Sequence, residues 1–425
     1  MNTPHPTPDA GTSTPRPSPV GRRAFLRGAT AVGAAGAGAA AFGVAEAMTA
    51  TAAPASGRRV PFEGVHQAGI VTPQQQAATF VSLQAIAPDR AALREMFRTL
   101  TDRARFLTAG GPAPAGDVAA VPSDSATLGP VVPSDGLTVT VGVGASLFDH
   151  RYGLADRRPA RLTAMPVFPD DHTDGSAELH GDISLQICAD SRDTVMHALR
   201  DITRHTRSGM QPVWKADGFR AAPRPSGTPR NQLGFKDGTG NPDVADPATA
   251  DALIWTRGAA DGEPAWADGG SYQVIRIIRM LVEFWDRVSL QEQETMIGRR
   301  RDSGAPLDGT AESDVPDYAA DPRGQVTSLD AHIRLANPRT ARSAAGRMLR
   351  RGYNYDRGLD LNGDLDVGLL FCCYQRDVAR QFQAAQERLA GEPLVDYVRP
   401  TGGGYFFALP GVRGPGDHLA AALLA

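Results

Sequence analysis

The stretch DISLQICADSRDTVMHALRDITRHTRSGMQPVWKADGF, residues 182–219, carries the alternation of elements from which the fold can be predicted. Residues 182–190 have the apolar and β-branched character of a strand, and residues 210–219 have it again. Between them, residues 191–206 place apolar side chains three and four positions apart, which is typical of an amphipathic helix. A strand, a helix and a strand in this order form half of a ferredoxin-like unit.

The rest of the chain extends this pattern in both directions. Upstream, a strand, a helix capped by Asp89 and a second strand are predicted at residues 78–87, 89–107 and 137–148. Downstream, Ser289 and Glu292 fit a capping box. The elements predicted there are strands at residues 271–284, 368–375 and 402–411, and helices at residues 289–301 and 377–390. We therefore predict an α+β fold of two ferredoxin-like halves, each an antiparallel four-stranded sheet with helices.

Residues 1–55 are predicted to be a leader that is not part of the fold. GRRAFLRG, residues 21–28, precedes a long uncharged run of alanine and glycine and then several small-residue cleavage sites. The paired Arg22 and Arg23 resemble a twin-arginine signal, which exports folded proteins. The alternative is a transmembrane anchor, which so much glycine and alanine disfavours. The predicted location is the periplasm or the cell exterior of a bacterium.

The domains predicted after the leader are an N-terminal one, residues 56–220, and a C-terminal one, residues 221–425. The C-terminal domain begins with a Pro/Gly-rich stretch, residues 221–270, that is too long for a simple linker and is expected to be functional. It contains GFKDGTGNP, residues 234–242, in which Asp237 sits among turn-forming residues. By composition alone, an ordinary surface turn has the same features.

Composition excludes some classes of function. The net charge is −3 and no basic run could follow a phosphate backbone, so nucleic acid is not an expected partner. The three cysteines form no C-x-x-C pair, which leaves zinc and iron–sulfur sites without ligands. Adjacent Cys372 and Cys373 lie in a predicted strand and should face opposite sides of it.

Among nine histidines there is no H-E-x-x-H or H-x-H pair. His332 lies in SLDAHIRLANPR, residues 328–339, which is interpreted as a short strand-like piece. Any single histidine can be structural, but one histidine suffices for a metal when haem supplies four nitrogens. Arg350, in MLRRGYNYD, could stabilise an anion on a bound peroxide, and Asp237 could accept the proton of that peroxide.

Six segments together resemble the dye-decolorising peroxidases, over nearly the whole chain after the leader. They are FEGVHQAGIVTP (62–73), HGDISLQICAD (180–190), GFKDGTGNP (234–242), HIRLANPR (332–339), RRGYNYD (350–356) and GGGYFFALPG (402–411). The twin-arginine leader is similar to the exported branch of this family, which includes haem deferrochelatases. The resemblance implies one haem b per chain, held in the C-terminal half.

The same resemblance implies roles for individual residues. His332 would be the axial ligand of the haem iron, and Asp237 and Arg350 would be catalytic on the opposite face of the haem. Some relatives carry asparagine two positions after this arginine, where this chain has Gly352, so any role of such an asparagine is in doubt. The residues implied to line the haem, besides His332, are Gly238, Thr239, Gly240, Asn337, Pro338, Arg339 and Arg350.

Three functions remain open from the sequence. The first is a peroxidase that uses hydrogen peroxide to oxidise dyes, phenols and other small organic reductants. The second is a deferrochelatase that takes free haem as substrate, in iron uptake, with iron-uptake proteins as partners. The third is a non-catalytic haem carrier, which would not need Asp237 and Arg350. A homodimer is compatible with all three.

A closed pocket would keep bulky dyes from the iron, so aromatic side chains would have to relay electrons. Tyr353 and Tyr355 are the favoured relay sites because they follow Arg350 within five residues. Each aromatic residue is equally explained as part of the core or the surface. The tryptophans considered as relay sites are Trp214, Trp255, Trp266 and Trp285.

Overall fold

The computed structural model describes residues 57–114 and 116–425, so the predicted signal peptide of residues 1–55 lies outside the described residues. The N-terminal half contains two long helices, α1 (Arg90–Ala109) and α2 (Arg192–Thr206). Its antiparallel strands lie in the order β4-β5-β1-β6, which is the ferredoxin-like order. These strands are β1 (Ala77–Ala85), β4 (Thr138–Gly144), β5 (Ile183–Ala189) and β6 (Met210–Phe219).

The C-terminal half repeats this arrangement in the order β11-β7-β10-β9. Its four strands are β7 (Ser271–Met280), β9 (Tyr353–Leu359), β10 (Leu365–Gln375) and β11 (Val398–Ala408). The strand predicted over residues 271–284 is too long, because Val282–Trp285 turn into the short helix α4. No strand was predicted for β9, which completes the second ferredoxin-like unit. The two halves confirm the predicted fold class.

The helices of the C-terminal half are shorter than predicted. Residues 289–301 give α5 (Leu290–Ile297), and residues 377–390 give a π-helical turn (Ala379–Gln383) that continues into α8 (Ala384–Leu389). The strand-like interpretation of residues 328–339 is wrong, because His332–Ala336 form the one-turn helix α6. Arginine, leucine and alanine in this segment all favour a helix over a strand. The remaining elements are β2 (Gly111–Pro112), β3 (Val131–Val132), α3 (Pro247–Leu253), α7 (Ala341–Ala345) and β8 (Leu349–Arg350).

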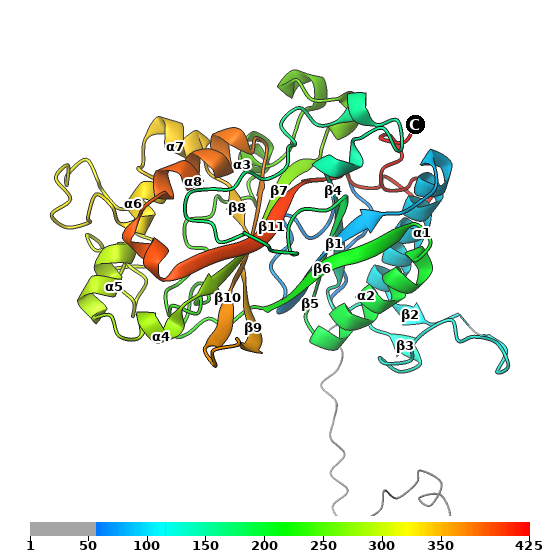
Figure 1. Cartoon of the computed structure of the whole chain (residues 1–425), viewed down its shortest axis with the longest axis horizontal. Coiled ribbons are helices and arrows are strands. Elements are labelled where there is room, and N and C mark those ends of the chain that lie inside the picture. Colours follow the sequence, from blue (N-terminus) through cyan, green and yellow to red (C-terminus); the bar gives the residue numbers. More distant parts are fainter. Residues whose placement is uncertain (1–56, 115) are drawn as a thin grey trace, which may run out of the picture. The chain divides into compact units, whose positions relative to one another are not determined.

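The two four-stranded sheets join edge to edge into a closed ring. β11 pairs with β4 at one junction, and β6 pairs with β9 at Phe219 and Asn354 at the other. Since β7 also pairs with β10, the eight strands close on themselves, and short β8 is added beside β10. In Figure 1, α1 and α2 lie side by side over the N-terminal half, whereas α4 to α8 surround the C-terminal half. Closure leaves few unpaired strand edges.

Local sequence signals at the helix ends and in the strands are confirmed. Asp89 accepts a hydrogen bond of 2.8 Å from the Ala92 amide at the start of α1. Ser289 accepts one of 3.2 Å from the Glu292 amide, which is one of the two bonds of a capping box. Cys372 and Cys373 are both fully buried and belong to two different hydrophobic clusters, one on each face of β10.

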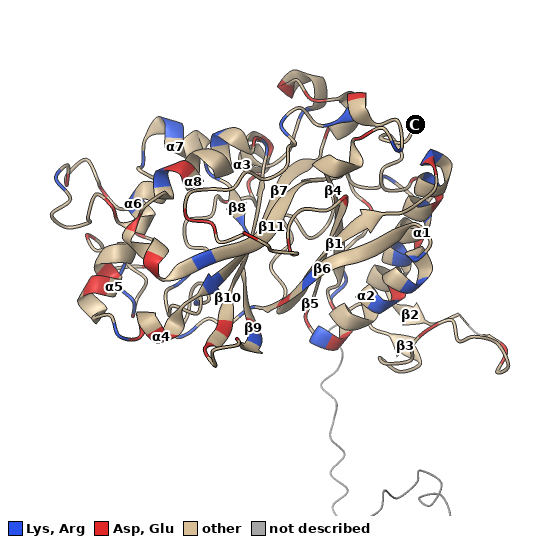
Figure 2. Cartoon of the chain, viewed as in Figure 1, with Lys and Arg blue, Asp and Glu red and all other residues tan. Residues whose placement is uncertain are grey.

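The surface of the described part mixes charges of both signs. Figure 2 shows acidic residues on α5 and basic residues on α7, with both signs on α1 and α2. In residues 57–114 and 116–425, no helix combines the length and the apolar composition that a bilayer crossing requires.

Candidate functional site

Asp237 lies on a tight loop that joins the two halves of the fold. We call residues 228–241 the Asp237 loop. The Asp237 amide donates to the Pro229 carbonyl at 2.9 Å, and the Asn241 amide donates to the Gly238 carbonyl at 3.0 Å. Gly238 has a φ of +113°, a conformation that residues with a Cβ rarely adopt. The glycine after Asp237 is therefore required by the turn that presents the carboxylate.

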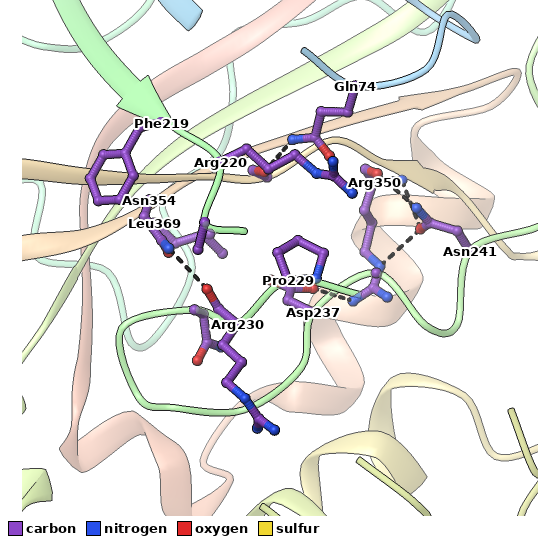
Figure 3. Close-up of a pocket in the computed structure, with 14 residues that line it drawn as sticks. Gln74, Phe219, Arg220, Pro229, Arg230, Asp237, Asn241, Arg350, Asn354 and Leu369 are labelled. Carbon is purple, nitrogen blue, oxygen red and sulfur yellow. Dashed lines mark hydrogen bonds and ion pairs between the residues drawn. The ribbon is translucent and has the colours of Figure 1, made fainter. Parts of the chain in front are cut away.

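Asp237 and Arg350 lie side by side in the lining of a small pocket. The Arg350 Nη1 to Asp237 Oδ1 distance is 3.4 Å, and about 30% of each side chain is exposed (31% and 27%). The pocket has a volume of about 40 Å³, which is room for one or two molecules the size of water or hydrogen peroxide. Figure 3 shows Arg350 between Asp237 and Asn241, whereas the guanidinium of Arg230 points away from them.

Asn241 fixes the position of Arg350. Its Oδ1 accepts hydrogen bonds from the Arg350 backbone amide at 3.1 Å and from Arg350 Nε at 3.3 Å. Its Nδ2 donates to the Arg350 carbonyl at 2.8 Å. A single amide thus orients both the main chain and the guanidinium of Arg350. Gly352 lines the same pocket, so the amide here comes from Asn241 rather than from that position.

His332 is the first residue of α6 and is held by a buried carboxylate. His332 Nδ1 lies 2.8 Å and 3.0 Å from the two carboxylate oxygens of Glu392, whose side chain is only 6% exposed. Burial alone would lower the pKa of the imidazole, but the Glu392 carboxylate outweighs burial and raises that pKa. A carboxylate on Nδ1 leaves Nε2 as the basic nitrogen for a metal, as in many metal-binding histidines.

His332 shares its electrostatic surroundings with the acid–arginine pair. The charge of Arg350 lowers the pKa of His332 and the charge of Asp237 raises it, so both groups lie within reach of the imidazole. Among the described residues, no cluster of three His, Cys, Asp or Glu side chains could bind a metal ion by itself. An iron held by one histidine and a porphyrin suits this donor set.

The structure divides the other predicted site residues into two groups. Gly238 lines the Asp237 pocket, and a Cβ at Gly240 would lie 3.6 Å from Arg350 Nη2. Thr239 instead donates a hydrogen bond of 2.9 Å to Glu312. The second group follows α6, on the His332 side. There Asn337 Oδ1 accepts from the Arg339 amide at 3.1 Å, Arg339 is exposed, and Pro338 lies between them.

Sequence reasoning missed several residues of this site. Asn241 lies inside the quoted GFKDGTGNP motif, but nothing local indicates that it contacts Arg350, 109 positions away. Glu392 is 60 positions from His332 and carries no motif. Gln74 and Arg220 bring the N-terminal half to the pocket, and both come from segments without a chemical signature.

A histidine supported by a carboxylate, within electrostatic reach of an acid–arginine pair in a two-part ferredoxin-like fold, defines the class of haem-binding oxidoreductases. Two family models match the chain: Dyp-type peroxidase, N-terminal, over residues 67–220, and Dyp-type peroxidase, C-terminal, over residues 228–413. The chain belongs to the Dyp-type peroxidase family.

The curated relatives with high identity to this chain are named deferrochelatases. The chain is 52% identical to the deferrochelatase of Escherichia coli strain K12 over 375 residues, which is 87% of this chain and 88% of that one. It is 52% identical to the deferrochelatase of Yersinia pestis over 371 residues, 86% of this chain and 85% of that one.

Solved structures of the same fold include a DyP-type peroxidase from Cellulomonas bogoriensis and ferric DtpA from Streptomyces lividans. The first has a TM-score of 0.77 and 38% identity, and the match covers 88% of this chain and 99% of that one. The second has a TM-score of 0.76 and 34% identity, and the match covers 86% of this chain and 97% of that one.

Proposed function

We propose that the protein is a haem b peroxidase that uses hydrogen peroxide to oxidise dyes, phenols and other small organic reductants. The observation that carries this proposal is the Asp237–Arg350 pair, 3.4 Å apart, within electrostatic reach of a histidine that Glu392 holds. A haem carrier would need His332 alone. An acid and a cation facing a pocket of peroxide size favour catalysis instead.

Each residue has a defined task in this proposal. His332 would hold the haem iron through Nε2, with Glu392 keeping the imidazole oriented. Bound haem supplies the redox centre. Asp237 would accept a proton from one peroxide oxygen and return it to the other, while Arg350 stabilises the negative charge that develops. One peroxide takes up two electrons and two protons and leaves as two waters, and two reductant molecules lose one electron each.

The haem contacts proposed here are those that the resemblance to the family implies. Gly238, Thr239, Gly240 and Arg350 would contact the haem. So would the segment after His332, which consists of Asn337, Pro338 and Arg339.

Large substrates would give up electrons at a distance. The pocket beside Asp237 and Arg350, at about 40 Å³, is smaller than a dye with fused rings. Tyr353 and Tyr355 lie on β9, shortly after Arg350 in the chain, and each is only 1% exposed. They therefore offer a path for electrons from the site through the protein. The Tyr353 hydroxyl contacts Cys188 Sγ at 3.5 Å inside the ring of strands.

The second candidate function is that of a deferrochelatase, which removes iron from haem, replaces it with two protons and leaves the tetrapyrrole intact. It is favoured by the 52% identity to curated deferrochelatases over 86–87% of the chain. Free haem would then be the substrate, and iron-uptake proteins would be the partners.

We also propose that the protein is exported by the twin-arginine route and that residues 1–55 are removed. The domains proposed for the rest of the chain are residues 56–220 and 221–425. A homodimer is compatible with either function.

One experiment separates the two candidates. Purified protein loaded with haem is mixed with one equivalent of peroxide, and the visible spectrum is followed with and without a phenolic reductant. A rapid spectral change that the reductant reverses supports the peroxidase. Growth of porphyrin fluorescence with release of iron to a chelator supports the deferrochelatase, because iron-free porphyrin fluoresces and haem does not. If neither the reversible spectral change nor the porphyrin fluorescence is observed, both candidate functions are refuted.

A further inference from the structure

Beside the site, Glu312 lies at the centre of a cluster of hydrogen bonds. Its Oε1 accepts from Thr228 Oγ1 at 2.6 Å, from Thr239 Oγ1 at 2.9 Å and from the Thr228 amide at 3.2 Å. Its Oε2 accepts from Lys236 Nζ at 2.5 Å. Lys236 is one of only two lysines in the chain, and its side chain is 4% exposed. An ion pair this enclosed is tolerated only when its remaining hydrogen bonds are made.

The donors to Glu312 all belong to the Asp237 loop. Lys236 directly precedes Asp237, and Thr239 follows it by two positions. Thr228 is adjacent to Pro229, whose carbonyl accepts the Asp237 amide at 2.9 Å. The carboxylate of Asp237 itself has one ion-pair partner among the described residues, Arg350 at 3.4 Å. Glu312 therefore anchors the turn that carries Asp237, through hydrogen bonds to residues on either side of Asp237 in the loop.

Packing around this cluster leaves it little freedom to rearrange. A Cβ at Gly227 would lie 2.0 Å from Glu312 Oε2, and one at Gly304 would lie 2.6 Å from Lys236 Cδ. Burial would raise the pKa of Glu312, but the hydrogen bonds from Lys236, Thr228 and Thr239 outweigh it and lower the pKa to about 2. Glu312 is consequently an anion at neutral pH.

Glu312 also belongs to the segment that leads to His332. It lies between α5 and α6, and its backbone carbonyl accepts a hydrogen bond of 2.9 Å from Arg299 Nη1. We propose that Glu312 is a positioning residue that sets the placement of Asp237 by tying the Asp237 loop to the segment preceding the His332 helix. This inference rests on the proposed role of Asp237 as the proton acceptor for peroxide.

The test compares Glu312→Ala and Glu312→Gln with Asp237→Asn and with the double variant Glu312→Ala/Asp237→Asn. Haem-loaded proteins are mixed with peroxide, and the rate of the first spectral change is measured. We expect Glu312→Ala to be slowed about 10²-fold, the scale on which misplacing a catalytic group lowers a rate. Glu312→Gln, which keeps the hydrogen-bond acceptor for the threonines, should recover part of that rate. In the Asp237→Asn background, adding Glu312→Ala should lower the rate of the reaction with peroxide only slightly further.

A second measurement needs neither haem nor activity. Hydrogen–deuterium exchange of the haem-free proteins should show faster exchange across residues 228–241 in Glu312→Ala, with exchange in β1 and β10 unchanged. The matched control is Glu263→Ala. Glu263 is also buried and accepts bonds from Ala160, Arg161 and Tyr272, outside the site. That variant should leave the peroxide rate and the exchange of residues 228–241 unchanged.

The outcomes distinguish this inference from the proposed function. If Asp237→Asn is slow but Glu312→Ala is as fast as the unaltered protein, the positioning role is refuted and the function stands. An equal loss from Glu312→Ala in both backgrounds would mean that Glu312 does not act through Asp237, which also refutes it. If Asp237→Asn itself reacts at the normal rate, the proposed role of Asp237 fails, and the positioning role fails with it. If Glu312→Ala does not fold, Glu312→Gln and Lys236→Met replace it, and their peroxide rates are compared with and without Asp237→Asn in the same way.

Discussion

Replacing Asp237 with asparagine should separate catalysis from stability. Asp237→Asn keeps the shape of the side chain but removes the carboxylate that would accept the peroxide proton. A positioned general base contributes about 10² to 10⁴ in rate, which corresponds to about 3–5 kcal/mol of activation free energy. The ion pair with Arg350 is lost as well. At 3.4 Å and with 27–31% of each side chain exposed, such a pair contributes about 0–1 kcal/mol to the free energy of unfolding.

The expected result is therefore a large loss of rate with a small change in melting temperature. Stopped-flow absorbance after mixing with peroxide gives the rate, and haem content is measured by the Soret band. Glu178→Gln is the matched control, because the Arg357–Glu178 pair has the same exposure, 29% for each side chain, and lies outside the pocket. If Asp237→Asn reacts within about threefold of the unaltered protein, Asp237 is not the proton acceptor for peroxide, and water takes that role.

Three further predictions follow from the same contacts. His332→Ala should fold and keep its far-ultraviolet circular dichroism but bind little haem, and a normal Soret band at full stoichiometry would contradict the ligand assignment. Replacing both Tyr353 and Tyr355 with phenylalanine should slow turnover of a large dye while the reaction with peroxide alone keeps its rate; unchanged dye turnover would place the electron path elsewhere. Because the pKa of Glu312 is lowered from 4.5 to about 2, its ionised form stabilises the fold above pH 4.5. The stability advantage of the unaltered protein over Glu312→Gln should shrink as the pH falls from 4.5 towards 2, and an advantage that grows on acidification would contradict the direction of this shift.

The fold was largely predictable because its signals are local. Apolar and β-branched runs identify β1, β4, β5, β10 and β11, and helical spacing identifies α1 and α2. Where two local signals compete, prediction failed. Residues 332–336 contain β-branched Ile333 and looked strand-like, but they fold as α6, where Glu392 meets His332. The boundary at Met280 was missed because the apolar run continues past the end of β7 into α4.

The sequence by itself determined which chemistry the protein contains. A carboxylate on a glycine turn, one histidine apart from other ligands and one nearby arginine are residue types and spacings that can be seen without coordinates. Only the tertiary structure decided how they are used. Pairing of β8 with β10 places Arg350 beside the Asp237 loop, so that Asn241 binds Arg350, and packing of α6 brings Glu392 to His332. Hydrogen bonds act over about 3 Å, while these partners lie 60 and 109 residues apart, so no local pattern in the chain could have paired them.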